Sequence, residues 1–367
     1  MNHQAEKTGA ARAGMPGQVV LVFQGGGALG AYQAGVYEAM HEAGIEPDWV
    51  IGTSIGAING ALVAGNRPEH RLERLQQFWE RMQHHSRSAI GFSDKLVSLA
   101  IIAQGIPAFF KPNSLAWRGP DAVLALEQAS YYSTEPLERT LRDLVDFDYL
   151  ADGPTRLTVG AVNARSGQMR YFDSSVETLG AAHVMASGAL PPAFPAVRID
   201  GQPYWDGGIY SNTPIEAVLE DRPRRDSVIF SVQVWNPHGP ELASLAQVIG
   251  KQKDIQFASR ASHIESQRQL HRLRHVIREL AAQMPAKLRA SPEVAELAAW
   301  GCGTTMHIVK LNAPMLDGED HGKDADFSTR GIRERWLAGY CDTRSILARQ
   351  PWNAAVDPIE GVLIHEP

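Results

Sequence analysis

A serine between two glycines is the part of this sequence best suited to chemistry. It lies in the pentapeptide Gly52-Thr53-Ser54-Ile55-Gly56, after a short β-branched run and before a helical pattern rich in small residues. This order is typical of a strand–turn–helix elbow, in which the serine hydroxyl is exposed at the end of a sheet. The N–H groups at the start of the helix favour negative charge beside the serine. Ser54 is therefore a candidate nucleophile, although so short a pattern is a weak signal alone, because it occurs by chance in many proteins.

A glycine-rich loop at residues 25–30 (GGGALG) lies between a predicted strand and a predicted helix. Its spacing also matches the dinucleotide-binding fingerprint, which requires an acidic residue at the end of the second strand. Here Asp48 precedes the second strand and the strand ends at Gly52, so the expected ribose contact is missing. Consecutive glycines can instead direct their N–H groups at a developing oxyanion, and losing one such donor typically costs ~10²–10³ in rate. The loop therefore indicates an oxyanion hole more strongly than a nucleotide site.

An aspartate followed by two glycines, Asp206-Gly207-Gly208, supplies a carboxylate after a predicted hairpin. An Asp-Gly pair usually forms a turn, because both residues tolerate turn dihedrals. At the end of a core strand the same carboxylate could reach Ser54 and accept its proton. With an ordinary pKa near ~4 it would stay ionised at neutral pH and be a weak base, so the oxyanion hole and the helix dipole would have to supply much of the rate. Thirteen histidines are present, and none lies in a context typical of a catalytic loop.

The elements that must position these residues alternate between strand and helix. The first 65 residues read as strand 18–23, glycine loop, helix 31–43, strand 49–52, elbow and helix, which predicts a parallel sheet with crossover helices. Residues 86–133 interrupt the pattern with short apolar pieces, which form either a packed side-subdomain or a lid or pocket wall. The further predicted elements are helix 69–84, helix 135–144 capped by Thr134, strands 156–162 and 168–172, helix 178–187, hairpin 197–205, a helix from Pro214, strands 228–235 and 304–311, and helix 328–347.

The region after residue 241 becomes helical and basic. Leu270, Leu273, Ile277, Leu280 and Met284 follow one another at intervals of three and four residues. This spacing predicts a long helix that packs on the core through these five residues and leaves its basic side chains in solvent. The alternative is a surface that meets anionic lipid or an acidic partner.

Composition bounds the classes of function. The chain has 367 residues, 44% of them hydrophobic and 21% charged, which is ordinary for a globular protein with a large core. The net charge of −6 argues against a nucleic-acid-binding protein. Cys302 and Cys341 indicate neither a disulfide framework nor a zinc site, so a cytoplasmic location is the simplest expectation. No run approaches the ~20 apolar residues of a transmembrane helix, and residues 1–16 are expected to form a disordered tail.

Taken together, these motifs resemble those of the patatin-like phospholipases. The resemblance implies a three-layer α/β/α sandwich with a central, mostly parallel sheet. It also implies a catalytic domain at 17–236, followed by a mainly helical C-terminal extension at 237–367 whose role the sequence leaves open. The matching motifs, which span about residues 18–220, are Gly-Gly-Gly-x-x-Gly at 25–30, Gly-x-Ser-x-Gly at 52–56, residues 186–195, Asp-Gly-Gly at 206–208 and Asn212-x-Pro214.

The same resemblance assigns roles to individual residues. It implies that Ser54 is the nucleophile and Asp206 the proton acceptor, in a dyad without histidine. The implied oxyanion donors are the N–H groups of Gly25, Gly26 and Gly27, with that of Ile55 assisting. The glycines that support these motifs are Gly30, Gly52, Gly56, Gly207 and Gly208.

The activity that the resemblance implies is hydrolysis of lipid acyl esters through an acyl-enzyme, with no metal and no other cofactor. The implied partner is a lipid ester, met in transient peripheral contact with a membrane surface, and the oligomeric state stays open. Leu29 departs from the pattern, because many members carry Arg or Lys there, and the change removes a positive charge beside the loop. Two alternatives remain: acyl transfer to an acceptor other than water, and a lipid-binding or regulatory module with vestigial catalysis.

Overall fold

The computed structural model describes residues 14–83, 104–238, 241–258, 261–316, 319–354 and 360–366. Most of the predicted tail and the first part of the 86–133 insertion, up to residue 103, lie outside these ranges.

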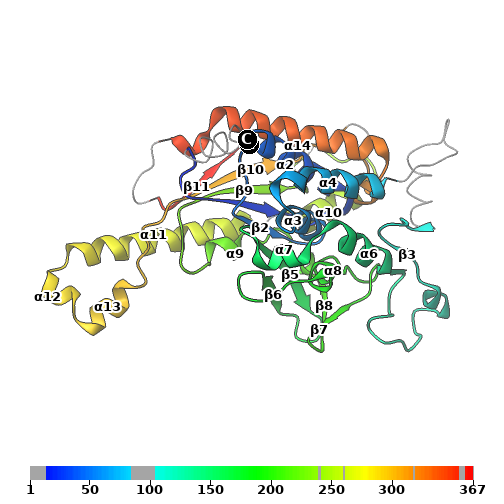
Figure 1. Cartoon of the computed structure of the whole chain (residues 1–367), viewed down its shortest axis with the longest axis horizontal. Coiled ribbons are helices and arrows are strands. Elements are labelled where there is room, and N and C mark those ends of the chain that lie inside the picture. Colours follow the sequence, from blue (N-terminus) through cyan, green and yellow to red (C-terminus); the bar gives the residue numbers. More distant parts are fainter. Residues whose placement is uncertain are drawn as a thin grey trace.

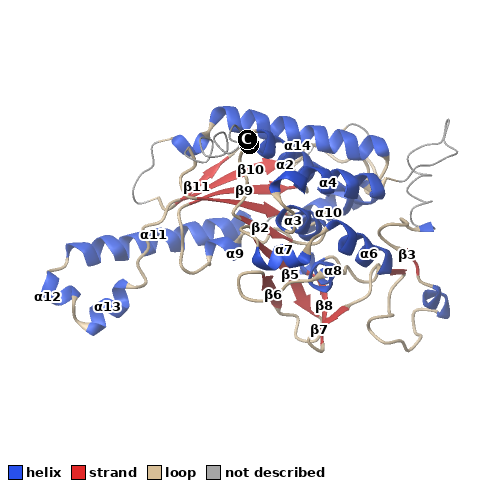
Figure 2. Ribbon diagram, viewed as in Figure 1, coloured by secondary structure: helices blue, strands red, loops and turns tan. Residues whose placement is uncertain are grey.

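One sheet of nine strands forms the centre of the described chain (Figures 1 and 2). Its order is β11-β10-β9-β1-β2-β5-β8-β7, and β6 also pairs with β5. Neighbouring strands from β11 to β5 are parallel, whereas β6, β7 and β8 pair antiparallel, so the predicted mostly parallel sheet is confirmed. The strands are β1 (Gln18–Phe23), β2 (Trp49–Gly52), β5 (Arg156–Asn163), β6 (Met169–Asp173), β7 (Val197–Ile199), β8 (Gln202–Asp206), β9 (Ser227–Gln233), β10 (Met306–Asn312) and β11 (Val362–His365).

Two hydrophobic cores lie on opposite faces of this sheet, because side chains alternate along a strand. In β1, Val19 and Leu21 belong to the larger core, and Val20 and Val22 belong to the smaller one. The larger core is covered by α2 (Ala31–Glu42), α3 (Ile55–Ala64), α4 (Pro68–Met82), α6 (Glu135–Leu144), α8 (Ala181–Ser187) and α14 (Thr329–Arg349). The smaller core is covered by α9 (Glu216–Leu219) and the start of α11 (Ala261–Gln283). The three-layer α/β/α sandwich is therefore confirmed.

The C-terminal region belongs to the same body. The predicted C-terminal helices are present, and the region also adds β10 and β11 to the sheet beside β9. Its helix α14 lies directly on α2: a Cβ on Gly339 would lie 2.1 Å from the Tyr32 carbonyl oxygen, and one on Gly35 would lie 1.9 Å from that of Trp336. Only glycine permits backbones to approach so closely.

Most predicted elements are present, and some boundaries differ. Thr134 precedes α6, but its side chain makes no cap, and the Ser133 hydroxyl oxygen accepts the Glu135 N–H at 3.4 Å instead. The helix expected from Pro214 begins at Glu216. The remaining described elements are β3 (Lys111–Pro112), β4 (Tyr132–Ser133), α7 (Phe147–Asp152), α10 (Leu245–Phe257), α12 (Ala286–Arg289) and α13 (Pro292–Ala298).

Helix α11 packs through the face opposite to the predicted one. Leu270, Leu273 and Leu280 were expected in the core, yet they are 40%, 61% and 57% exposed. His271 and His275 are buried instead. The expectation was wrong because an apolar stripe marks a surface suited to burial without specifying which partner buries it.

The buried face of α11 is polar, and its two histidines lie against one backbone carbonyl group. Ring nitrogens of His271 and His275 lie 2.8 and 3.3 Å from the Thr304 carbonyl oxygen. Ile264, one residue of the same face, reaches the smaller core. Beyond this contact the end of α11, with α12 and α13, projects from the body (Figure 1).

Candidate active site

Ser54 occupies a sharp turn between β2 and α3. Its backbone has φ 57° and ψ −123°, a positive φ that residues other than glycine seldom adopt. The turn is held from outside, because the Ser54 N–H donates to the carbonyl and hydroxyl oxygens of Ser187 at 3.1 and 3.0 Å. The Ser187 hydroxyl donates in turn to the Gly160 carbonyl oxygen at 2.6 Å. The strained elbow that the pentapeptide predicts is therefore present, at the N-terminus of a helix.

The glycines on either side of Ser54 allow the strands and the helix to touch. A Cβ on Gly52 would lie 2.3 Å from the Gly56 carbonyl oxygen, and one on Gly56 would lie 2.3 Å from that of Phe23. Contacts this short do not occur for real Cβ atoms, so alanine at either position would push α3 away and displace the serine.

Asp206 is the last residue of β8, and the fold brings it to Ser54. It is 2% exposed, accepts the Gly208 N–H at 2.7 Å and borders the same cavity as Ser54. Burial raises the pKa of Asp206 to about 7, and the hydrogen bonds from Gly208 and Ser54 oppose the rise. The expectation of a weak base with a pKa near ~4 was wrong, because it left burial out. A carboxylate whose pKa is close to neutral is able to take up and return a proton near pH ~7.

The glycine loop lies over the elbow and borders the same cavity. Gly27 has φ 55°, and a Cβ there would lie 2.3 Å from the Asp324 carbonyl oxygen. Gly25 was expected to be an oxyanion donor, but its N–H already donates to the Asn212 carbonyl oxygen at 3.1 Å. Among the hydrogen bonds of the described residues, none uses the N–H of Gly26, Gly27 or Ile55. Those three N–H groups are the ones left to meet an anionic oxygen.

Gln24 holds the glycine loop in place, and the sequence analysis missed it. Its side-chain oxygen accepts the N–H groups of Val234 and Trp235 at 2.6 and 2.9 Å. Its side-chain amide donates to Thr213 at 2.8 Å and to the Phe257 carbonyl oxygen at 3.0 Å. A polar residue at the end of an apolar strand run was the available signal, because a fully buried amide must be hydrogen-bonded.

A second chain of buried hydrogen bonds supports the loop from behind. Gln33 donates to the Gln24 carbonyl oxygen at 2.6 Å, and Asn59 donates to Gln33 at 2.9 Å and to the Gly30 carbonyl oxygen at 3.0 Å. The Trp79 indole N–H donates to Asn59 at 3.1 Å. The loop therefore has little freedom to shift relative to α3.

Ser54, Asp206 and the glycine loop open into one cavity of about 240 Å³. Its other walls are apolar and mostly aromatic. Residues 104–133, the described part of the predicted insertion, contribute three of these aromatic side chains. The aromatic side chains that line it are Phe109, Phe110, Tyr132, Phe194, Trp235, Phe257 and Phe327. A cavity with apolar walls and a few convergent polar groups suits a ligand with a hydrocarbon part.

Residues beyond the predicted catalytic domain complete this cavity. Part of the cavity wall lies after residue 236 and consists of Phe257, Asp324, Ala325 and Phe327. The Phe257 carbonyl oxygen also accepts the Asn212 side-chain amide at 2.8 Å. The site is therefore built by both regions of the chain.

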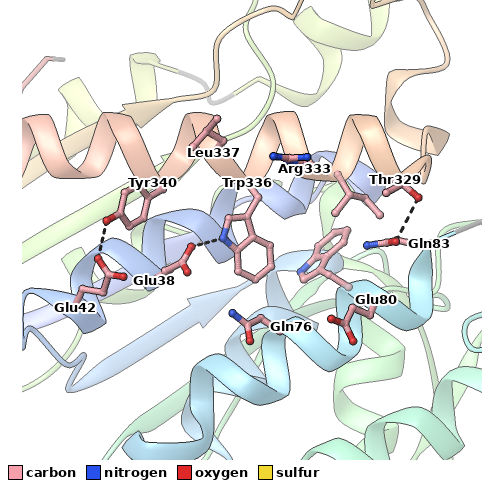
Figure 3. A pocket seen from close by; sticks show the side chains of 12 residues that line it. Glu38, Glu42, Gln76, Glu80, Gln83, Thr329, Arg333, Trp336, Leu337 and Tyr340 are labelled. Carbon is pink, nitrogen blue, oxygen red and sulfur yellow. Dashed lines mark hydrogen bonds between the residues drawn. The ribbon is translucent and has the colours of Figure 1, made fainter.

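A larger hollow of about 510 Å³ lies elsewhere, between α2, α4 and α14 (Figure 3). Trp336 donates to Glu38 and Tyr340 donates to Glu42 along its wall (Figure 3). None of the predicted site residues borders it. Trp79 does border it, and the Trp79 ring stacks on Phe327, a wall residue of the smaller cavity, at 6.4 Å between ring centroids.

The described residues contain no group of three or more His, Cys, Asp or Glu side chains arranged to hold a metal ion. Within the same residues no helix is both long enough and apolar enough to cross a bilayer.

Two family profiles match the chain. One is described as patatin-like phospholipase and matches residues 21–219, which is more than half of the sequence. The other, DUF3734, is described as patatin phospholipase and matches residues 255–359. The two profiles together cover both regions that build the cavity.

Several curated proteins are similar to the chain over limited stretches. Lysophospholipase nte1 of Aspergillus terreus is 61% identical over 81 residues, which are 22% of this chain and 5% of that protein. Patatin-like phospholipase domain-containing protein 7 of Mus musculus is 25% identical over 231 residues, 63% of this chain and 14% of that protein. Triacylglycerol lipase ptl3 of Schizosaccharomyces pombe is 29% identical over 94 residues, which are 26% of this chain and 18% of that protein. The chain thus spans less than a fifth of the length of each of these relatives.

Solved structures give only distant likenesses. VipD from Legionella pneumophila has a TM-score of 0.38 and 15% identity, over 92% of this chain and 69% of that chain. ExoU of Pseudomonas aeruginosa, solved with SpcU, has a TM-score of 0.31 and 17% identity, over 94% of this chain and 76% of that chain. Scores this low add nothing to the fold described above.

Proposed function

The chain belongs to the patatin-like phospholipase family, and from this premise we propose that it hydrolyses acyl esters of lipids with Ser54 and Asp206 as catalytic residues. The observation that carries the proposal is that the Ser54 hydroxyl and the buried Asp206 carboxylate meet at one cavity with aromatic walls. The family match over residues 21–219 and the lipid hydrolases among the similar proteins support the same class of substrate.

Acylation begins with a bond between the Ser54 hydroxyl oxygen and the carbonyl carbon of the ester. Asp206 accepts the hydroxyl proton as this bond forms. The carbonyl oxygen becomes an oxyanion, which the N–H groups of Gly26, Gly27 and Ile55 stabilise from the loop and the start of α3. When the tetrahedral intermediate collapses, the ester bond to the alcohol breaks, and Asp206 returns the proton to the departing alkoxide.

Deacylation repeats these steps with water in place of the serine. Asp206 takes a proton from the water, whose oxygen attacks the acyl-enzyme carbonyl carbon. The same three N–H groups stabilise the second oxyanion, and collapse releases the fatty acid and restores the Ser54 hydroxyl. In the proposed cycle Asp206 accepts and returns every proton that is transferred. The cycle therefore involves no histidine, metal ion or other cofactor.

The apolar part of the cavity provides for the acyl chain. Phe109, Phe110, Phe194 and Tyr132 contact one another as a cluster of rings along one wall. This arrangement suits a lipid acyl chain beside the reacting carbonyl. We retain the expectation of a cytoplasmic protein that meets lipid in transient contact at a membrane surface.

Leu29 lies where many family members carry a basic residue. It is buried and lines a small pocket together with Lys323 and Arg335, both from the C-terminal region. These cations pair with carboxylates, Lys323 with Asp254 at 2.7 Å and Arg335 with Glu319 at 3.2 Å. We propose that Leu29 leaves the reaction intact, because it supports the loop by packing.

The test compares wild type with Ser54→Ala and Asp206→Asn on a p-nitrophenyl ester and on a set of phospholipids, lysophospholipids and triglycerides. Each variant should lose at least ~10³-fold in kcat while keeping the wild-type circular dichroism spectrum, since dyad members act as a unit. A fluorophosphonate probe should label wild type at Ser54 and leave Ser54→Ala unlabelled.

Retained hydrolysis in either folded variant would exclude the dyad. Tight lipid binding by a wild-type protein that neither turns over esters nor reacts with the fluorophosphonate would favour the lipid-binding module. Formation of new esters when glycerol or another alcohol is added would identify acyl transfer.

A further inference from the structure

The apolar stripe of α11 faces away from the body. It comprises Leu270, Leu273, Ile277, Leu280 and Met284, the last directly after the end of the helix. Its three leucines are 40%, 61% and 57% exposed, and Ile277 and Met284 are half-buried. The opposite face of the helix is buried as far as His275. Contiguous exposed apolar surface of this kind marks an interaction site.

Within the part of the chain that the structure describes, the leucines of this stripe are left exposed. The apolar run at residues 96–102 lies outside the described residues, and it is flanked in sequence by α4 and β3. Both of these elements lie at the end of the molecule opposite the projecting part of α11 (Figure 1). The first 13 residues are polar and small, so they offer no apolar surface.

The charges around the stripe do not favour an anionic membrane. The part of the chain that projects with the stripe carries as many exposed acidic residues as basic ones. The basic residues are Arg278, Lys287 and Arg289, and the acidic ones are Glu279, Glu293 and Glu296. Binding to anionic lipid depends on an excess of positive charge, which this surface lacks.

The spacing of the stripe fits another helix. Intervals of three, four, three and four residues average 3.5, the repeat at which two α-helices bury a shared apolar seam. Four of the residues beside the stripe are uncharged, Gln269, Val276, Ala281 and Gln283, and the fifth, Arg274, is 8% exposed. An antiparallel second copy would place its Arg274 near Ala281 rather than near another Arg274, so like charges would not meet along the seam.

We propose that α11 pairs with α11 of a second copy of this chain, antiparallel about a two-fold axis at Ile277. The seam is nearly self-complementary when the second helix runs antiparallel. Reflection about Ile277 exchanges Leu270 with Met284, seven residues away on either side, and brings Leu273 to within one residue of Leu280. A two-fold axis closes the assembly as a dimer. The projecting end of each α11 then lies against its counterpart, and the two catalytic bodies stand apart.

The first test is the mass in solution by light scattering over a range of protein concentrations. Wild type should have twice the mass of one chain, and Leu273→Glu/Leu280→Glu should have the mass of a single chain. Burying a leucine contributes enough that each change, made twice in a symmetric dimer, should raise the dissociation constant by ~100-fold or more. Leu337→Glu, a leucine on α14 that is also 57% exposed, is the matched control and should remain a dimer.

The second test fixes the direction of pairing by introducing one cysteine at a time in a Cys341→Ser background, in which the remaining Cys302 is buried. Ile277→Cys should form a disulfide-linked dimer on mild oxidation, because residue 277 meets itself at the axis. Leu270→Cys should not, since antiparallel copies place it about 21 Å from its counterpart along the helix axis. Cross-linking of both variants would show parallel helices and overturn the arrangement proposed here.

A wild-type protein that stays monomeric at every concentration would refute the pairing. Sedimentation of wild type with phosphatidylcholine or phosphatidylglycerol vesicles, lost in Leu273→Glu/Leu280→Glu, would then assign the stripe to a bilayer. The circular dichroism spectrum and the ester hydrolysis rate of each variant check that the body remains folded, independently of whether the proposed substrate class is right.

Discussion

The cavity at Ser54 and the hollow between α2, α4 and α14 share aromatic walls but differ in their polar groups. The hollow has about 510 Å³ against about 240 Å³ for the cavity. Its polar side chains pair with one another, as Trp336 does with Glu38 and Tyr340 with Glu42. The cavity holds a buried carboxylate with a pKa of about 7 beside a serine. Volume therefore says little about chemistry, which depends here on a carboxylate and a hydroxyl that converge on one space.

One side chain connects the two spaces. Trp79 borders the larger hollow, stacks on Phe327 of the cavity and donates to Asn59, which supports the glycine loop. Changes in the cavity should therefore affect catalysis strongly, changes in the outer hollow should not, and a change at Trp79 should fall between them.

After substitution of Ser54 or Asp206 themselves, the largest expected effect comes from Gly27→Ala. The added Cβ would lie 2.3 Å from the Asp324 carbonyl oxygen, and Gly27 has a φ of 55°. The loop would therefore have to move, and its N–H groups would no longer point at the oxyanion. We expect kcat to fall by ~10²–10³. Gly201→Ala is the control, because Gly201 also has a positive φ, 74°, but no atom lies within 4 Å of its added Cβ. Equal activity of the two variants would remove the loop from the mechanism.

The next effect is the dependence of kcat/KM on pH. Asp206 must be deprotonated to accept the serine proton, and its pKa is raised to about 7 by burial. The rate should therefore fall about tenfold for each pH unit below ~7 and level off above it. His183→Gln should keep the same profile, since His183 lies outside the proposed proton path. A rate that stays constant down to pH ~5 would contradict the raised pKa.

A smaller effect is expected in the aromatic wall. Phe110 packs against Tyr132 and Phe194, with ring centroids 4.8 and 5.4 Å apart. Phe110→Ala should lower kcat/KM for a long-chain ester about tenfold more than for an acetyl ester, because it removes contacts with the acyl chain. The ratio of the two rates corrects for any loss of folded protein. Leu337→Ala, in the outer hollow, should leave the ratio unchanged.

The smallest effect tests the connection between the two spaces. Trp79→Phe keeps the aromatic packing but removes the hydrogen bond of 3.1 Å to Asn59. The loss of one buried hydrogen bond, about 1 kcal/mol, should reduce kcat roughly fivefold. Trp336→Phe removes the bond to Glu38 in the outer hollow and should leave kcat as it is. A decrease of the same size in both would show that the hollow acts on the site by another route.

The sequence predicted the parts of the site that are local. The glycine loop, the elbow at Ser54 and Asp206 each follow a short apolar run, and each lies at the end of a strand. The carboxyl ends of the parallel strands β1 and β2 lie at one edge of the sheet, so the glycine loop meets the elbow there. Asp206 ends β8, which runs antiparallel to β5, so its position beside Ser54 does not follow from this rule. The mostly parallel sheet and its crossover helices followed from the same alternation.

Features that depend on what a surface meets could not be predicted. The pKa of Asp206 depends on burial by neighbours that the motif does not contain. Phe109, Phe257 and Phe327 line the cavity from three separate regions, and no pattern joins them. The spacing of apolar residues in the sequence located the stripe of α11. It did not indicate that the body of the protein covers the opposite face of the helix.

The wall formed by residues 324–327 has a consequence for how the protein is made. Ser54 leaves the ribosome early, whereas Phe327 and α14, which covers α2, follow on the order of tens of seconds later at ordinary rates of synthesis. Until then the serine is present without its enclosing cavity. A chain that ends before residue 327 would therefore lack part of the wall that encloses Ser54.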